Sequence, residues 1–334
     1  MNRQKTRRRK PNANRPLLGI IWLLIAALIM LAIVALNTQP DVPGTESTAA
    51  SDETSDAAQD SQQTQASEPE PTQTVPLTPG WADRDGNRYF VLEDGTYATG
   101  WMEYEGSKYY FKEDGTMARG RIEVEGQAFF FTSTGANIML VNPWNYIPDG
   151  YSPELMDLPD EIGEGQRVDS SCYDALLRMI GDCNAAMKEQ HTGNGKLPQA
   201  YVVSSHRTQE YQAGLYNRKV DSLIAQGYSR EEAEKKAATV SAIPGTSEHQ
   251  LGLAVDIIDT QLWSLVEEQE DLAAQQWLMQ NSWRYGFILR YPQDKIDITG
   301  IIYEPWHYRY VGNAVAQELW ESGLTLEEYL DELS

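Results

Sequence analysis

The sequence predicts an α+β domain with a small antiparallel sheet flanked by helices, preceded by a β-hairpin repeat solenoid, a disordered tether and one transmembrane helix. Three observations support this order: an uncharged apolar stretch near the N-terminus, a set of three similar units in the middle, and helical and strand-like patterns towards the C-terminus. The 334 residues are enough for two folded units beside the N-terminal segments. We therefore divide the chain into 1–16, 17–36, 37–79, 80–139 and 140–334.

Charge is distributed unevenly along the chain. Positions 1–15 hold seven of the 27 basic residues and no acidic one, although the whole chain has a net charge of −22. The remaining 20 basic residues face 49 acidic ones, which gives −29 for the rest of the chain. Nucleic-acid binding requires a basic footprint, so this composition argues against it. The acidity fits a solvated extracellular protein, although solubility alone also accounts for it.

Residues 17–36 form an uncharged apolar stretch whose length, as a helix, matches the thickness of a bilayer core. The basic tail at 1–16 should stay in the cytoplasm, which places the C-terminus outside the cell. A cleaved signal peptide is the alternative, but its apolar region is usually shorter and no clear small-x-small cleavage site follows. We expect an uncleaved signal anchor, and hence a single-pass protein of the cell membrane.

Residues 37–79 contain no Lys or Arg and almost no large apolar residue. Such a segment cannot bury enough surface to offset its ordering entropy, so we expect a disordered tether.

Residues 80–139 contain three units of equal length, each with a glycine turn, an aromatic strand and a second turn that is Asp-Gly in the first two units. This pattern predicts one β-hairpin per unit. A single hairpin cannot bury its own face, so the units should stack. They resemble the cell-wall-binding repeats of the choline-binding type, in which aromatic cages hold quaternary ammonium groups. The aromatic residues that match those positions are Trp81, Trp101, Tyr89, Tyr109 and Tyr110.

Arg121 stands where the third unit should have its tryptophan, so at most one cage looks complete. Three interpretations remain open: the repeats bind choline, they bind another wall polymer, or they are a structural spacer whose aromatic residues form its small core.

The stretches 247–256 and 304–310 contain two of the chain's four histidines. A catalytic zinc takes three protein ligands from His, Asp or Glu and leaves one position for water. His249, Asp256 and His307 would fill this set, and Glu304 would be free to move protons. The seven-residue spacing from His249 to Asp256 does not fit one helix turn, but it fits a loop that leads through Gly252 into a strand.

The pattern Ser-x-His-x-x-Gly-x-Ala-x-Asp, followed about 50 residues later by Glu-x-x-Trp-His, resembles the zinc site of the VanY-type D-alanyl-D-alanine carboxypeptidases. The resemblance covers about 140–315 and implies a hedgehog-like fold, one zinc ion per chain and peptidoglycan stem peptides as substrate. It also implies Glu304 as the catalytic base. Arg207 lies in a segment similar to the family's Ser-x-x-Arg motif, and its planar fork suits a substrate carboxylate. It is also a candidate catalytic residue that polarises the substrate and stabilises the tetrahedral oxyanion beside the zinc. Gln212 and Ser247 are further candidates for substrate hydrogen bonds.

The remaining elements follow from periodicity. Amphipathic patterns predict helices at 170–189, 208–240 (split near Gly227), 270–284, 312–322 and 325–333. Strands are expected at 202–203 and 253–257, with 285–292 and 299–303 as a strand pair that ends at Glu304. Cys172 and Cys183 lie eleven residues apart on one predicted helix, too far for a disulfide, so we expect buried thiols. A break in the helix between them would make a disulfide possible, and an extracellular location would allow it.

The sequence leaves the reaction open among related activities. The resemblance favours removal of the C-terminal D-alanine from stem peptides, with L,D-carboxypeptidase action on tetrapeptide stems as the alternative. Dipeptidase action is disfavoured, because so small a substrate would not need a tether and wall-binding repeats. A wall-binding protein with an inactive peptidase domain should lack a ligand or the base, but all four residues are present.

Overall fold

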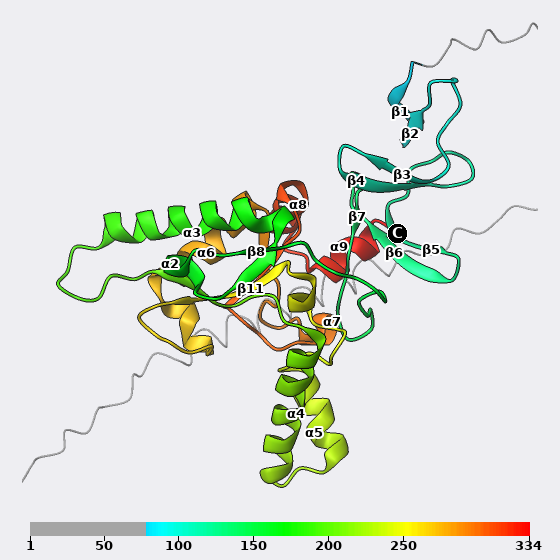
Figure 1. The fold of residues 1–334 in the computed structure, drawn as a ribbon. Helices are drawn as coiled ribbons and strands as arrows, with labels where there is room; N and C mark the ends of the chain where they lie inside the picture. Colours follow the sequence, from blue (N-terminus) through cyan, green and yellow to red (C-terminus); the bar gives the residue numbers. More distant parts are fainter. Residues whose placement is uncertain (1–77) are drawn as a thin grey trace, which may run out of the picture. The chain divides into compact units, whose positions relative to one another are not determined.

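The computed structural model describes residues 78–334 (Figure 1). The predicted cytoplasmic tail, the transmembrane anchor and nearly all of the tether lie outside the described residues. Within 78–334, no helix is both long and apolar enough to cross a bilayer.

Each of the three repeat units forms a β-hairpin, as predicted. The hairpins pair β1 (Gly80–Arg84) with β2 (Asn87–Val91), β3 (Gly100–Tyr104) with β4 (Ser107–Phe111), and β5 (Gly120–Val124) with β6 (Gln127–Phe131). An acidic residue and a glycine form each turn, and both have positive φ: Asp85 has 53° and Gly86 has 78°. Two consecutive positive φ angles are typical of the type I′ turn that joins twisted strands.

The second turn of a unit leads to the next hairpin. In the first unit, Asp94 accepts hydrogen bonds from the Thr96 backbone and hydroxyl, at 2.9 and 2.6 Å. Consecutive units are joined by a backbone hydrogen bond of 2.8 Å from Met117 N to Arg88 O. Phe111, Met117 and Ala98 form a small core against which Trp81 packs. The stacking expected from the repeat pattern is therefore present.

The third repeat packs against the C-terminal helices. A short strand, β7 (Asn137–Ile138), extends its hairpin, and Phe130, Ile138 and Leu140 share one hydrophobic cluster with α8 (Asn313–Ser322) and α9 (Leu326–Glu332). The backbone N–H of Arg121 donates to Ser334 Oγ at 2.8 Å. The third hairpin thus completes its core with residues from the far end of the chain.

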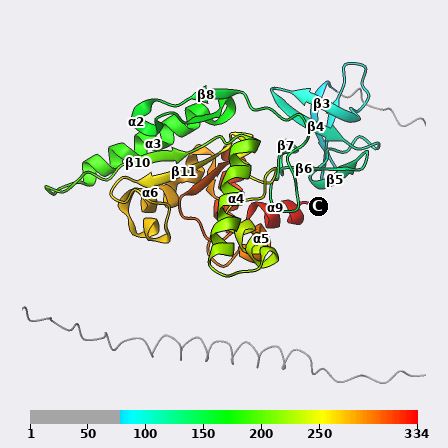
Figure 2. The ribbon, with the colours of Figure 1, turned by 60° about the horizontal axis from the view of Figure 1, so that its bottom comes forward.

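A four-stranded antiparallel sheet forms the centre of the second part, as the sequence predicts. Its order is β10 (Ala200–Ser204), β11 (Ala254–Asp259), β13 (His307–Tyr310) and β12 (Phe287–Leu289). The largest hydrophobic cluster joins this sheet to α3 (Ser170–Gln190) and α6 (Ala273–Asn281), which lie close to it in Figure 2. Because this core holds β11 and β13 rigidly, their residues can form a precise site.

Short elements surround the sheet. The predicted helix pair is α4 (Gln209–Ala225) and α5 (Arg230–Ala238), which lie side by side in Figure 1. Gly227 lies between them, and Ser229 caps α5 in a capping box, as its sequence indicates. The remaining elements are β8 (Leu155–Asp157), α2 (Asp160–Gly163), β9 (Arg167–Asp169), η1 (Glu248–Leu251), η2 (Glu267–Asp271), η3 (Ser282–Tyr285) and α7 (Ile296–Thr299).

The predicted strand pair 285–292 and 299–303 is wrong. Only β12 forms in the first stretch, and its partner is β13, which begins after Glu304. The residues before 300 form the short helix α7, which ends at Gly300 with φ 77°. Ile301 and Ile302 line a cleft, so their apolar side chains belong to the cleft wall and do not indicate a β-strand. The α-helix within the predicted range 270–284 is also shorter than expected. It covers only Ala273–Asn281, and the chain then forms the 3-10 turn η3.

Both cysteines are buried and free on α3, as expected. Burial raises the pKa of the Cys172 and Cys183 thiols to about 12. Neither is a reactive thiolate at neutral pH.

Candidate metal centre

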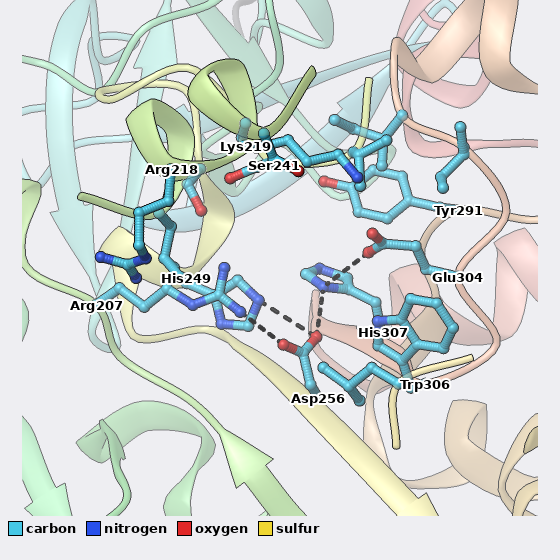
Figure 3. A pocket seen from close by; sticks show the side chains of 18 residues that line it. Arg207, Arg218, Lys219, Ser241, His249, Asp256, Tyr291, Glu304, Trp306 and His307 are labelled. Carbon is cyan, nitrogen blue, oxygen red and sulfur yellow. Dashed lines mark hydrogen bonds and ion pairs between the residues drawn. The ribbon is translucent and has the colours of Figure 1, made fainter. Parts of the chain in front are cut away.

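The three predicted metal ligands come together from separate elements (Figure 3). Asp256 lies in β11 directly opposite His307 of β13, because the antiparallel register pairs these two residues. His249 comes from the 3-10 turn η1, which ends at Gly252 with φ 74°. A Cβ atom at Gly252 would lie 3.1 Å from the backbone N of Asp169. Glycine is therefore required here both for the positive φ angle and for the close contact between the two backbone segments. The structure thus brings the three predicted residues together, and their role as metal ligands stays a prediction.

Both imidazoles face the same carboxylate oxygen. His249 Nε2 lies 3.3 Å and His307 Nδ1 lies 3.1 Å from Asp256 Oδ1. All three side chains are buried, and one ligand atom from each lies within 4.8 Å of the others. The other nitrogen of His249, Nδ1, lies 2.8 Å from the Ser205 carbonyl and donates to it, which leaves the Nε2 lone pair pointing at the centre. Two imidazoles and one carboxylate in this arrangement fit a zinc ion with an open position.

The charges around the cluster favour deprotonated ligands at two of the three positions. Burial raises the pKa of Asp256, but His249, His307 and Arg207 outweigh it and hold this pKa well below its usual range. Burial, with the charge of Arg207, lowers the pKa of His249 to about 4, so its imidazole is neutral at pH 7. Burial lowers the pKa of His307 as well, but the carboxylates of Asp256 and Glu248 raise it to about 9. A metal ion must therefore displace a proton from His307.

Glu304 lies beside the ligands without joining them. Its Oε2 is 3.7 Å from His307 Nδ1, and burial raises the pKa of its carboxyl to about 8. Its backbone N–H donates to the Tyr291 carbonyl at 3.1 Å, and its own carbonyl accepts from His307 N at 3.1 Å. A buried carboxyl with a pKa near neutrality is suited to taking a proton and returning it.

Arg207 reaches the centre from the loop after β10. Its Nη2 donates to Asp256 Oδ2 and to Ser204 Oγ, both at 2.7 Å. Its Nη1 lies on the other side, 3.4 Å from Gln212 Oε1, and the side chain is 17% exposed. All three guanidinium nitrogens thus have a hydrogen-bond partner within the protein, while the residue still lines the cleft.

Gln212 does not contact the cleft, contrary to its predicted role in substrate binding. It is fully buried and donates from Nε2 to the Ala242 carbonyl at 2.7 Å. Its position behind Arg207 supports that side chain and the loop before Ser247. Ser247 itself is buried and lies on the cleft wall, and its hydrogen bond to substrate stays a prediction.

A cleft of about 510 Å³ opens above these residues. Besides the ligands, Arg207 and Glu304, it is lined by residues of α4 and of the segments at 240–242 and 301–302, and by Tyr291 and Trp306 (Figure 3). Tyr291 and the α4 residues Arg218 and Lys219 were missed from the sequence. The helical pattern marks α4 as amphipathic, but it does not show which polar residues face a cleft.

A buried ionic cluster behind the centre was also missed. Glu248, Arg290 and Arg309 are each 1% exposed and are joined by hydrogen bonds of 2.8 Å. The available signal was Arg290 directly after the apolar strand β12 and Arg309 within β13, because a buried guanidinium requires a carboxylate partner.

Four of the five predicted repeat aromatics form two contact sites, one around Trp81 and one around Trp101, and Tyr89 lies outside both. Trp81 contacts Tyr109 of the next unit at 5.0 Å between ring centroids, and Arg88 lies over its ring at 4.5 Å. Trp101 contacts Tyr110 at 5.3 Å and Phe129 of the third unit at 4.8 Å.

The Trp101 site is open, with a cavity of about 400 Å³ beside the ring, and Trp101 is 45% exposed. Tyr89 joins neither site, because its nearest aromatic contact is Tyr97 of its own unit at 4.6 Å. Arg121, in place of the third tryptophan, is exposed.

Comparisons with known proteins agree with this geometry. A family model for VanY D-alanyl-D-alanine carboxypeptidases matches residues 166–313, and a choline-binding repeat model matches 98–144. A D-alanyl-D-alanine carboxypeptidase of Enterococcus faecalis is 41% identical over 195 residues, which cover 58% of this chain and 66% of the relative. A bifunctional D-Ala-D-Ala dipeptidase and carboxypeptidase of Enterococcus gallinarum is 41% identical over 140 residues, which cover 40% of this chain and 67% of that protein.

Among solved structures, the LdcB LD-carboxypeptidase is similar with a TM-score of 0.50 and 32% identity, covering 65% of this chain and 95% of that one. The chain thus spans about two thirds of the length of these curated relatives. The matched residues contain the whole metal centre and Glu304. This chain belongs to the VanY family of D-alanyl-D-alanine carboxypeptidases, which are zinc metallo-carboxypeptidases.

Proposed function

We propose that this chain is a membrane-anchored zinc carboxypeptidase that removes the C-terminal D-alanine from peptidoglycan stem peptides. One observation carries the proposal: His249 Nε2 and His307 Nδ1 converge on Asp256 Oδ1, with Glu304 Oε2 3.7 Å from His307, at the base of a cleft. The named activities of the relatives, D-Ala-D-Ala carboxypeptidase among them, support the choice of substrate.

His249, Asp256 and His307 would hold the zinc ion, which would supply Lewis acidity at the base of the cleft. Glu304 takes the proton of the attacking water at a carboxylate oxygen and passes it to the nitrogen of the leaving D-alanine. The raised pKa of Glu304 in its buried setting favours the first transfer, because the protonated acid is a stable state there.

Arg207 orients the substrate. A carboxypeptidase must recognise a free C-terminal carboxylate, and the guanidinium on the cleft wall has one edge held by Asp256 and Ser204. These contacts fix the plane of the guanidinium, so the part of Arg207 that lines the cleft meets the carboxylate with little further loss of side-chain freedom. Trp306 and Tyr291 close the wall beside Glu304 and limit access of water.

The proposal includes a location for this reaction at the cell wall. We take 17–36 as the membrane anchor with the N-terminus in the cytoplasm, and 37–79 as the tether. The open Trp101 site is the place where the repeats bind choline or another wall polymer, because it offers an accessible ring and a cavity of about 400 Å³.

Mass spectrometry of muropeptides tests the reaction. The full chain in detergent micelles is incubated separately with pentapeptide and tetrapeptide stems, beside the Glu304→Gln variant. We expect the pentapeptide to lose one alanine and the variant to be at least about 100-fold slower, because glutamine cannot move the proton. Loss from the tetrapeptide alone would establish L,D cleavage by the same site, an activity for which the LD-carboxypeptidase relative is named. Release from neither stem by a zinc-loaded chain would overturn the proposal.

A further inference from the structure

A buried carboxylate lies directly behind one of the metal ligands. Glu248 precedes His249 on η1 and is 1% exposed. Its Oε2 is buried and has no hydrogen-bond partner among residues 78–334, and the same holds for Nε2 of His307. These two atoms lie 3.6 Å apart. Two orphaned polar atoms that face each other in a buried setting indicate a pair, because each would otherwise lose its hydration without compensation.

Two arginines determine which oxygen of Glu248 faces the histidine. Arg290 Nε and Arg309 Nη1 both donate to Oε1, each at 2.8 Å. Arg290 also forms a two-bond pair with Glu327 of α9, at 2.8 and 2.6 Å, and Arg309 donates to the Met139 carbonyl at 2.8 Å. These contacts fix both guanidinium groups. Glu248 Oε1 is therefore fully used, and Oε2 remains for His307.

We propose that Glu248 is a positioning residue that accepts a hydrogen bond from His307 Nε2–H and thereby holds Nδ1 as the metal-binding nitrogen. A neutral imidazole carries one proton, and its place decides which nitrogen has a free lone pair. With the proton on Nε2, the Nδ1 lone pair points towards Asp256 Oδ1, where the metal ligands converge. A shift of about 0.5 Å brings Nε2 and Oε2 within hydrogen-bond distance. The inference rests on the metal site of the proposed function, but not on its substrate.

The rival account is a purely structural ion cluster. Glu248 and Glu327 balance the charges of Arg290 and Arg309, so the cluster would be neutral without any contribution from His307. The two accounts differ in what a neutral replacement of each glutamate does to the metal.

The decisive variant is Glu248→Gln in the full chain. Both arginines require an oxygen, so the amide nitrogen must turn towards His307 Nε2. An amide donor there favours the tautomer with its proton on Nδ1, which removes the lone pair that the metal needs. We expect the dissociation constant for zinc to rise about 10- to 100-fold. In the cobalt-substituted protein, the visible absorption bands should shift, because the ligand set is distorted.

Glu327→Gln is the matched control. It removes a carboxylate from the same buried cluster, but Glu327 has no contact with His307. We expect its melting temperature to fall as in Glu248→Gln, while its zinc affinity stays within about twofold of wild type. Equal zinc affinity in Glu248→Gln and wild type would overturn the proposal, and so would the same loss of affinity in both variants.

A measurement on the wild-type holoenzyme covers the case in which Glu248→Gln does not fold. Nitrogen-15 NMR of the zinc-bound protein should show a proton on Nε2 of His307 and none on Nδ1. A proton on Nδ1 would refute the role of Glu248. A wild-type chain that binds no zinc would instead refute the proposed metal site itself, so the two failures can be told apart.

Discussion

In the metal centre the functional atoms are buried and joined by short polar contacts, whereas in the repeats the ring of Trp101 is 45% exposed and packs through aromatic edges. The metal ligands are brought together by the register of β11 and β13, two strands that are distant in sequence. The Trp101 site forms between adjacent hairpins. In a buried site built from distant segments, the charges are oriented before substrate binds. An exposed site between neighbouring hairpins recurs with each repeat, and its residues can be substituted without disturbing a core.

The two repeat sites show how easily such a position changes. Both contain a tryptophan at the start of a hairpin, yet Arg88 lies over Trp81 at 4.5 Å and occupies the place where a ligand cation would bind. The Trp101 site has no such guanidinium and keeps an open cavity. Lys108, one repeat after Arg88, lines this cavity, and Phe129 takes the place that Tyr109 has beside Trp81, so the two sites differ at more than one residue.

The largest effect is expected where the buried site meets substrate. Arg207→Ala removes the fork and leaves Asp256 without its 2.7 Å partner, so kcat/KM for pentapeptide should fall about 100- to 1,000-fold. Arg207→Lys keeps the charge but not the planar pair of donors, so we expect its kcat/KM to stay below about a tenth of the wild-type value. Steady-state kinetics with one stem peptide measures both. A lysine variant with nearly full activity would show that Arg207 acts by charge alone.

A smaller effect, on the free energy of unfolding, is expected from substitutions that test whether the third repeat shares a hydrophobic core with the C-terminal helices. Gly120 has φ 66°, and a Cβ atom there would lie 2.5 Å from the Leu333 carbonyl carbon. Gly100, one repeat earlier, has φ 73° and nothing within 4 Å. Gly100→Ala should cost about 1 kcal/mol of unfolding free energy from backbone strain alone, and Gly120→Ala about 2–3 kcal/mol because the C-terminal residues must also move. Chemical denaturation measures both, and equal losses would contradict the shared core.

The smallest effect is expected in the exposed repeats. Trp101→Ala should weaken choline binding about tenfold, which corresponds to the loss of one cation–π contact. Arg88→Ala should leave that affinity intact and add a second, weaker site, because it uncovers the Trp81 ring. Isothermal titration with choline chloride gives affinity and stoichiometry. A loss of binding in Arg88→Ala would place the ligand at Trp81 and reverse the comparison between the two sites.

The residues of the metal centre could be predicted because chemistry restricts them to a few types at fixed spacings. His249, Asp256, His307 and Glu304 carry that information in two short motifs. The hairpins were predictable for a similar reason, because their glycine turns recur at a constant interval along the chain.

Features that depend on tertiary burial were not predictable. Glu248 and its two arginines are distant in sequence, and a charged residue in a strand has no periodic signal that names its partner. The apolar residues Ile301 and Ile302 indicated burial correctly but not its cause, since a cleft wall and a strand require the same residue types. Gln212 matched a motif position, yet only the packing shows that it faces Arg207 and the loop at 242.

The contact between the third repeat and the C-terminal helices has a consequence for the order of folding. During synthesis the first two hairpins can stack as soon as they emerge, because their small core lies within 80–118. Phe130, Ile138 and Leu140 must wait until α8 and α9 are made, after the whole central sheet has been synthesised. Closing so long a loop is slow compared with local hairpin formation. A ribosome pause or a truncation near the C-terminus would therefore leave the third hairpin with exposed apolar side chains, even though it is encoded long before that point.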